Sequence, residues 1–151
     1  MLNPDYRDML SLLIKNHVDF MIIGAYALAY HGFPRATGDI DLFVASDLLN
    51  SRRICKALVE FGAPVASLDD AYFATKGNYF QVGVAPCRID ILNEIDGIEF
   101  ATTRRVEAEI DGLKVRVIAK EDFIKNKRAI GRHKDLADVE CLENAKDRPA
   151  G

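Results

Sequence analysis

Two aspartates that alternate with apolar residues give the clearest chemical signal in the sequence. Asp39 and Asp41 are separated by Ile40 and followed by Leu42. Side chains two positions apart on a strand point to the same face, so the carboxylates project together while the apolar residues face a core. Adjacent carboxylates repel each other unless a cation or a donor neutralises them. Mg²⁺ (or Mn²⁺) suits the pair, because it binds a few carboxylates together with phosphate oxygens. The alternative is two acids at the solvent end of a strand.

A third carboxylate, Asp90, lies between Ile89 and Ile91 in an otherwise apolar segment. An acid in such a strand is costly to bury without a partner. One candidate partner is Arg88, two residues earlier on the same face. The other interpretation makes Asp90 a shared metal ligand, or the base that activates an acceptor hydroxyl.

A glycine follows the apolar run 20–23 and precedes a short helical segment. Backbone N–H groups at such a strand-to-helix junction favour a phosphate group, which makes Gly24 a candidate for phosphate contact. A simple tight turn is the alternative for this glycine.

The segment 125–134, KNKRAIGRHK, contains five lysines and arginines and no acid. A solvated face explains most of them, since cations near the end of a helix are favoured. Lys127, however, falls on the apolar stripe of the predicted helix, four residues after Phe123. It either extends outward to solvent or reaches an anion, which is Asp135, Asp138 or a bound triphosphate.

Hydrophobic periodicity and turn residues predict the elements that position these groups. We expect a helix starting at Asn3-Pro4, helices over 25–30, 47–61, 121–130 and 134–145, and strands over 20–23, 39–45, 79–84, 88–92, 106–110 and 113–118. The dipeptide Asp111-Gly112 predicts a tight hairpin between the last two strands. The resulting fold class is α/β (α+β), a small mixed β-sheet flanked by helices.

Length and composition set limits on organisation and location. The 151 residues fit one domain, 1–145, with a frayed tail over 146–151. The net charge of −3 argues against general attraction to nucleic acid or anionic lipid. No apolar run approaches the roughly 20 residues of a membrane span, and the N-terminus lacks the features of a signal peptide. Three scattered cysteines predict reduced, mostly buried thiols, so we expect a cytoplasmic protein with no membrane association.

Taken together, these motifs resemble a known family. Gly24-Ala25, then thirteen residues, then Asp39-Ile40-Asp41-Leu42, with Asp90 on a later strand, resembles the minimal nucleotidyltransferases of the DNA polymerase β superfamily. The stretches GAYALAYHGFPRATGDIDLFV and KNKRAIGRHKDLADVECL are also similar to the small nucleotidyltransferase-like proteins related to abortive-infection toxins of type IV toxin–antitoxin systems. The resemblance covers about residues 18–143.

The resemblance implies a nucleotidyltransferase fold and a role for each matching residue. Asp39, Asp41 and Asp90 are implied to be catalytic and to bind Mg²⁺ (or Mn²⁺). The implied nucleotide-binding residues are Gly24, Ala25, Arg35, Thr37, Lys127 and Lys134. Ala25 stands where the family usually has Gly or Ser, so a hydroxyl contact to phosphate is lost while backbone donors remain. Arg35 and Thr37 either contact phosphate or acceptor, or stabilise the turn before Asp39.

Two functions follow from the resemblance. The first is transfer of a nucleoside monophosphate from a nucleoside triphosphate to RNA, a protein or a small molecule, in a toxin–antitoxin system or outside one. The second is a non-catalytic nucleotide-binding regulator, or one half of a toxin–antitoxin pair that acts through a partner protein encoded nearby. The intact set of three aspartates favours the enzyme, whereas Ala25 leaves the second function open.

Overall fold

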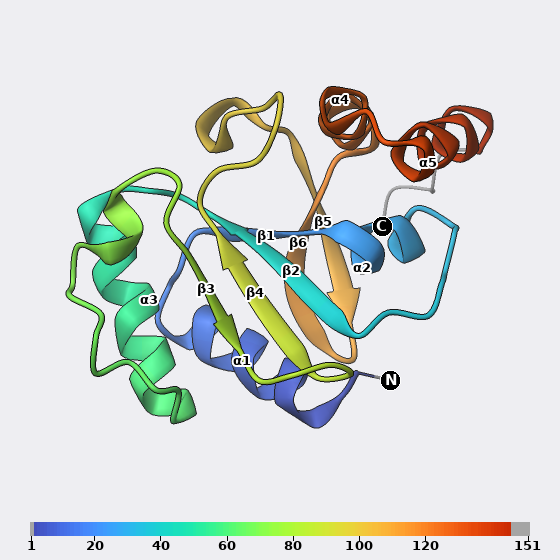
Figure 1. The fold of residues 1–151 in the computed structure, drawn as a ribbon. Coiled ribbons are helices and arrows are strands. Elements are labelled where there is room, and N and C mark those ends of the chain that lie inside the picture. The colour runs from blue at the N-terminus through green and yellow to red at the C-terminus, as the bar shows by residue number, and fades with distance from the viewer. Residues whose placement is uncertain (1, 146–151) are drawn as a thin grey trace.

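The computed structural model describes residues 2–145, which form a six-stranded mixed sheet with helices on both faces (Figure 1). The strands are β1 (Phe20–Ile23), β2 (Asp39–Val44), β3 (Tyr79–Val82), β4 (Arg88–Leu92), β5 (Arg105–Ile110) and β6 (Leu113–Ile118), in the order β3-β4-β2-β1-β6-β5. The pairs β2–β4 and β1–β6 are parallel and the other three are antiparallel. The predicted fold class is confirmed.

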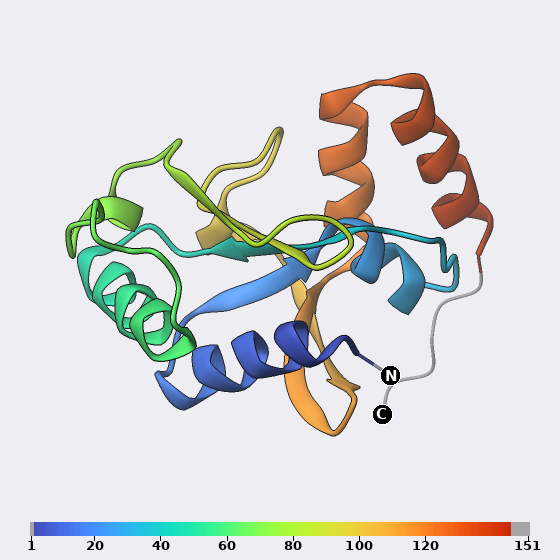
Figure 2. The same ribbon diagram turned by 60° about the horizontal axis from the view of Figure 1, so that its bottom comes forward.

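The helices divide between the two faces of the sheet. They are α1 (Pro4–Lys15), α2 (Gly24–Tyr30), α3 (Leu48–Phe61), α4 (Lys120–Ile130) and α5 (His133–Asn144), with short 3₁₀ turns η1 (Tyr72–Ala74) and η2 (Phe100–Thr102). Figure 2 shows α1 and α3 together on one side of the sheet and the α4–α5 pair on the other. No helix of residues 2–145 has both the length and the apolar character required to cross a membrane.

Alternation along β2 separates the core from the chemistry. Ile40 and Leu42 are buried, with 1% and 0% of their surfaces exposed, and they pair with Ile89 and Ile91 of β4. This apolar row is part of the main hydrophobic core. The intervening Asp39 and Asp41 therefore point to the opposite face, as the alternation predicts.

The predicted element bounds hold to within a few residues, and each difference has a local cause. α3 begins one residue late because the Asp47 carboxylate accepts a hydrogen bond from the Asn50 N–H and so caps the helix. β3 ends at Val82 because Gly83, with φ +77°, turns the chain. The Asp111-Gly112 hairpin is confirmed, with both residues at positive φ.

Two further predictions concern the cysteines and the C-terminal tail. The expectation of mostly buried thiols is wrong, because Cys55 and Cys87 are only half-buried and Cys141 is exposed. The predicted frayed tail, 146–151, lies outside the described residues.

Candidate active site

The parallel pairing of β2 with β4 brings the three predicted aspartates together. In this register Asp41 lies directly opposite Asp90, while Asp39 lies opposite Arg88. One carboxylate oxygen from each of Asp39, Asp41 and Asp90 lies within 4.8 Å of the other two. Three oxygens at that spacing form a ligand set for a divalent cation, since Mg²⁺ and Mn²⁺ prefer carboxylate oxygens. Among residues 2–145, no other group of three acidic, histidine or cysteine side chains brings its ligand atoms within 4.8 Å of one another.

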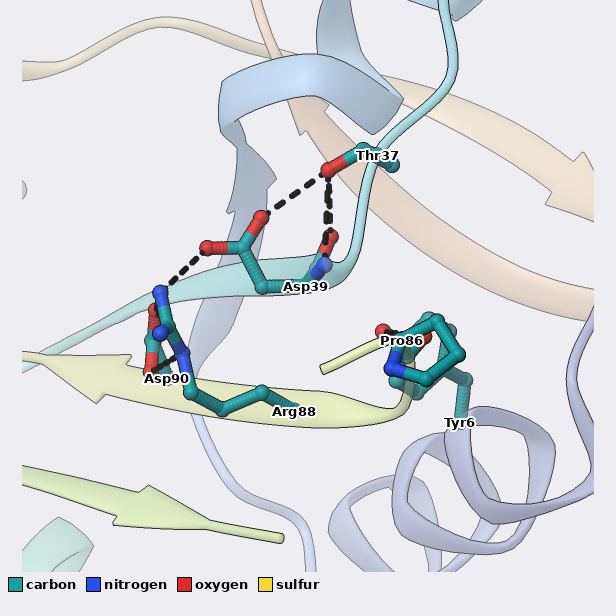
Figure 3. A network of polar contacts seen from close by, with 6 residues as sticks. All are labelled: Tyr6, Thr37, Asp39, Pro86, Arg88 and Asp90. Atoms are coloured by element: carbon teal, nitrogen blue, oxygen red, sulfur yellow. Dashed lines mark hydrogen bonds and ion pairs between the residues drawn. The ribbon is translucent and has the colours of Figure 1, made fainter. Parts of the chain in front are cut away.

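A guanidinium group bridges two of these carboxylates, as Figure 3 shows. Arg88 Nη2 donates to Asp39 Oδ2 at 2.8 Å and to Asp90 Oδ2 at 3.2 Å. Arg88 Nε lies 3.1 Å from Asp90 Oδ1 and 3.3 Å from Asp90 Oδ2. The sequence predicted Arg88 as a candidate partner of Asp90, and that contact is present. Its simultaneous contact with Asp39 was missed, because it depends on which strands pair.

Thr37 holds the start of β2 in place. Its hydroxyl donates to Asp39 Oδ1 at 2.9 Å, and its oxygen accepts from the Asp39 N–H at 3.3 Å (Figure 3). Of the two roles expected for Thr37, the structure therefore shows the one in which it orders the turn before Asp39. Figure 3 also shows the Tyr6 hydroxyl of α1, which donates to the Pro86 carbonyl at 3.2 Å and ties α1 to the loop before β4.

The Asp41 carboxyl group is strongly perturbed by its surroundings. Its pKa is raised to about 7, mainly by burial and then by the nearby charges of Asp39 and Asp90, with a partly compensating effect from Arg88. A carboxyl group that is costly to ionise beside two other acids is stabilised by an added cation. The electrostatics therefore favour a bound metal at this position.

Gly24 leaves room for the Asp41 carboxylate. The glycine has φ +70°, and a Cβ built on it would lie 2.2 Å from Asp41 Oδ2. Both the backbone conformation and the close approach thus require glycine at this junction of β1 and α2. The positive φ agrees with the alternative of a tight turn, and the close approach of Asp41 is a second reason for glycine here.

A cavity of about 320 Å³ opens beside Asp39 and Asp41, with α2 on one side and the start of α5 on the other. Its lining includes every predicted nucleotide-binding residue: Gly24, Ala25, Arg35, Thr37, Lys127 and Lys134. Arg132 and Asp138 also line it and were not predicted as site residues. Arg132 belongs to the basic segment noted in the sequence, and Asp138 was predicted only as a candidate partner of Lys127.

Ion pairs immobilise the basic side of the cavity. Lys127 is 8% exposed. Its Nζ lies 2.9 Å from Asp138 Oδ2, as an ion pair without hydrogen-bond geometry. It also lies 3.5 Å from Asp135 Oδ1. Arg35 pairs with the other oxygen of Asp138, and Arg132 Nε lies 2.6 Å from Asp135 Oδ2. Of the alternatives for Lys127, the structure shows pairing with both acids rather than extension to solvent. The lysine reaches the cavity wall with its charge already compensated.

A larger hollow, about 710 Å³, lies away from the triad, where α1 meets the β5–β6 hairpin. Its wall mixes cations such as Arg53 and Arg116 with acids such as Asp19 and Glu107. The two sets of charges are balanced there, and no group of three metal-ligating side chains within residues 2–145 falls on this wall. The candidate metal ligands Asp39 and Asp41 line the smaller cavity instead.

Comparison with known proteins agrees with this geometry. The sequence profile of a family described as "Nucleotidyl transferase of unknown function (DUF2204)" matches residues 3–150, nearly the whole chain. The chain therefore belongs to this family of nucleotidyl transferases. No curated protein matches it in sequence.

Solved structures share the fold at low identity. TM1012 of Thermotoga maritima has been assigned as a nucleotidyltransferase. It is 17% identical with a TM-score of 0.64, over 95% of this chain and 96% of that one. The lincosamide antibiotic adenylyltransferase LnuA, solved with lincomycin, is 14% identical with a TM-score of 0.61, over 97% and 99%. The antibiotic-resistance factor ANT(2'')-Ia is 19% identical with a TM-score of 0.60, over 91% and 80%. These likenesses establish a nucleotidyltransferase fold.

Proposed function

We propose that this member of the nucleotidyl transferase family moves a nucleoside monophosphate from a nucleoside triphosphate onto an acceptor, using a divalent cation held by Asp39, Asp41 and Asp90. The observation that carries the proposal is the meeting of three carboxylates within 4.8 Å, two of which, Asp39 and Asp41, line a cavity that also has basic residues in its wall. Such a site matches the charges of a metal-bound triphosphate. The complete triad favours an enzyme over a non-catalytic regulator.

The chain's own donors fit Mg²⁺ or Mn²⁺. All three candidate ligands are carboxylates, and the raised pKa of Asp41 reflects burial and crowding that a cation relieves. When bound, the cation neutralises the developing charge on the phosphoryl oxygens. Asp39 is already oriented for this role by Thr37, and Asp41 by its close contact with Gly24.

The remaining residues position the substrates. Lys134, Arg35 and Arg132 line the cavity and supply positive charge toward a triphosphate. Gly24 and Ala25 present backbone rather than a side-chain hydroxyl at the same wall. Asp90 takes the proton of the attacking acceptor hydroxyl, the acceptor oxygen bonds to the α-phosphorus, and pyrophosphate leaves.

The nucleotide and acceptor are open to direct test. LnuA is an adenylyltransferase, and ANT(2'')-Ia has been seen with adenylyl-2''-tobramycin, so ATP is the first triphosphate to try. For this chain the acceptor is RNA, a protein or a small molecule. The resemblance further supports a cytoplasmic role in a toxin–antitoxin pair, which predicts a partner gene in the same short operon.

A labelling experiment tests the proposal. The protein is incubated with Mg²⁺, a cell extract and ATP that carries the label on either the α- or the γ-phosphate. Transfer of the monophosphate predicts an acceptor labelled from the α-position only, and no labelling in the presence of a chelator. Label from the γ-position would instead indicate phosphoryl transfer and contradict the proposal, as would the absence of labelling with all four nucleoside triphosphates.

A further inference from the structure

The bridge formed by Arg88 occupies carboxylate oxygens of two of the three candidate metal ligands. Its guanidinium contacts Asp39 Oδ2 and both carboxylate oxygens of Asp90, at distances from 2.8 to 3.3 Å. A bidentate contact to one acid combined with a contact to a second is a strong arrangement, since each hydrogen bond joins two charged groups. Arg88 thus partly neutralises the triad in the chain as it stands.

A cation and the guanidinium compete for the same carboxylate oxygens. We propose that Arg88 is an internal counter-cation, which holds the metal-free triad in place and leaves the carboxylates when the divalent ion binds. The inference rests on the proposed metal site of the triad, and it adds a positioning residue whose displacement is part of loading that site. Metal affinity is therefore set partly by the strength of this ion pair.

The surroundings allow such a displacement. The Arg88 side chain is 37% exposed, whereas Asp90 is 10% exposed at the side chain and stays fixed in the sheet. β3, the neighbour of β4 on the other side, is an edge strand, and its Gln81 lies opposite Asp90 and is exposed. The arginine can therefore turn toward solvent along this edge without disturbing the buried Ile89 and Ile91, which point to the opposite face of β4.

Replacing Arg88 should have opposite effects on the metal-free and the metal-bound protein. Without metal, Arg88→Gln leaves three crowded carboxylates with no counter-charge, so the variant should melt at a lower temperature in the presence of a chelator. With metal, the variant no longer has to break the bridge, so its affinity should rise roughly tenfold, which corresponds to about 1.4 kcal/mol. If Arg88 had a purely structural role, its replacement would lower both the melting temperature without metal and the affinity for metal.

The measurement is Mn²⁺ binding without nucleotide, followed by electron paramagnetic resonance, for the wild type and Arg88→Gln. Asp39→Asn identifies the fraction of binding that belongs to the triad. Arg104→Gln is the matched control, because Arg104 forms a comparable multiple contact with Asp122 away from the triad. This control should leave Mn²⁺ affinity at the triad unchanged.

A second variant and a spectroscopic readout separate displacement from simple removal of charge. Arg88→Lys keeps the charge but loses the fork that spans both acids, so its affinity should lie above that of the wild type. In NMR spectra the Arg88 Nε–H signal should shift when Mg²⁺ is added, as its hydrogen bonds to Asp90 break. Because this signal is recorded on the wild type, it still tests the displacement if Arg88→Gln does not fold.

The outcomes are distinct. Equal or weaker Mn²⁺ binding by Arg88→Gln and Arg88→Lys, or an Arg88 Nε–H signal unmoved at saturating Mg²⁺, would overturn the displacement while leaving the proposed function intact. Failure of the wild type to bind Mn²⁺ at the triad would overturn both. Tighter binding in both variants together with a metal-induced shift supports the inference.

Discussion

At the scale of single residues, the site is a balance between three acids and the cations around them. Asp39 and Asp90 share Arg88, whereas Asp41 forms no ion pair in the set of contacts described for residues 2–145. The sequence predicted the three acids, because alternation with isoleucine and leucine places each of them on the polar face of its strand. It predicted Arg88 as a candidate partner of Asp90 but not the contact of Arg88 with Asp39, since that contact joins side chains from separate strands.

The Asp41 carboxyl group should make metal-free stability depend on pH. Its pKa is raised from 3.8 to about 7, chiefly by burial, so the folded state holds a proton that the unfolded state releases. The stabilising contribution is complete below about pH 3.8 and is lost as pH rises through 7. At about 1.4 kcal/mol per pKa unit, up to about 4 kcal/mol disappears over this interval.

The measurement is denaturant unfolding of the wild type and Asp41→Asn between pH 4 and 8 in the presence of a chelator. We expect the wild type to lose stability relative to Asp41→Asn as pH rises. Asp111→Asn, in the exposed hairpin turn, is the control and should follow the wild type. Parallel pH profiles for the wild type and Asp41→Asn would contradict the assignment of the raised pKa to this carboxyl group.

We expect Lys127 to contribute more to the stability of the fold than to the binding of nucleotide. Lys127→Met keeps the packing against Phe123 but leaves the buried Asp138 and Asp135 with only their arginine partners. Removing one member of a buried pair typically costs about 3–5 kcal/mol, and the remaining arginines place this case near about 3 kcal/mol. Chemical denaturation without nucleotide measures it.

The exposed Lys125 on the same helix provides the control, since Lys125→Met should change stability by less than about 0.5 kcal/mol. Calorimetric titration with ATP and Mg²⁺ distinguishes a direct role. Unchanged stability of Lys127→Met combined with a loss of affinity would mean that the lysine binds triphosphate rather than holding α4 and α5 together.

At the scale of elements, the register of β2 against β4 assembles the triad. The sequence predicted both strands and the face of each acid, because that information is local. The pairing of Asp41 with Asp90 and of Asp39 with Arg88 is not local, since forty-nine residues separate each pair of positions. A shift of one residue in this register would put Asp90 on the apolar face, so the buried isoleucines of the two strands also protect the site.

The junction between β1 and α2 should tolerate no side chain. Gly24→Ala adds backbone strain at φ +70° and a Cβ that would lie 2.2 Å from Asp41 Oδ2, so Asp41 must move. We expect a loss of more than about 1 kcal/mol in stability from the left-handed conformation alone. We also expect loss of the thermal stabilisation that Mg²⁺ and ATP give the wild type.

Gly62→Ala is the matched control for this prediction. Gly62 also has positive φ, +88°, but a Cβ there would meet nothing within 4 Å. It should show the backbone cost while retaining the full response to Mg²⁺ and ATP in thermal melting. An undiminished response in Gly24→Ala would mean that Asp41 adapts to the new side chain and that the close approach is not needed for binding.

At the scale of the whole molecule, one layer of helices supports the sheet and the other completes the site. α1 and α3 lie on one side of the sheet and the α4–α5 pair lies on the other (Figure 2). Lys127 of α4, Lys134 of α5 and Arg132 between them line the cavity beside β2. Periodicity predicted these helices and the basic segment between them. It could not predict the strand order β3-β4-β2-β1-β6-β5, because this order arises from contacts between distant segments.

The central claim, that this fold uses its triad for nucleotidyl transfer, is tested most directly by transfer from α-labelled ATP in wild type and Asp90→Asn. The substitution preserves volume and leaves Asp39 and Asp41 in place, so the variant should fold and retain ATP binding with Mg²⁺ at similar or moderately reduced affinity. Loss of proton transfer predicts a rate lower by roughly 10²–10⁴-fold per folded molecule. Asp111→Asn should match the wild type. An Asp90→Asn variant that labels the acceptor at the wild-type rate would contradict the account.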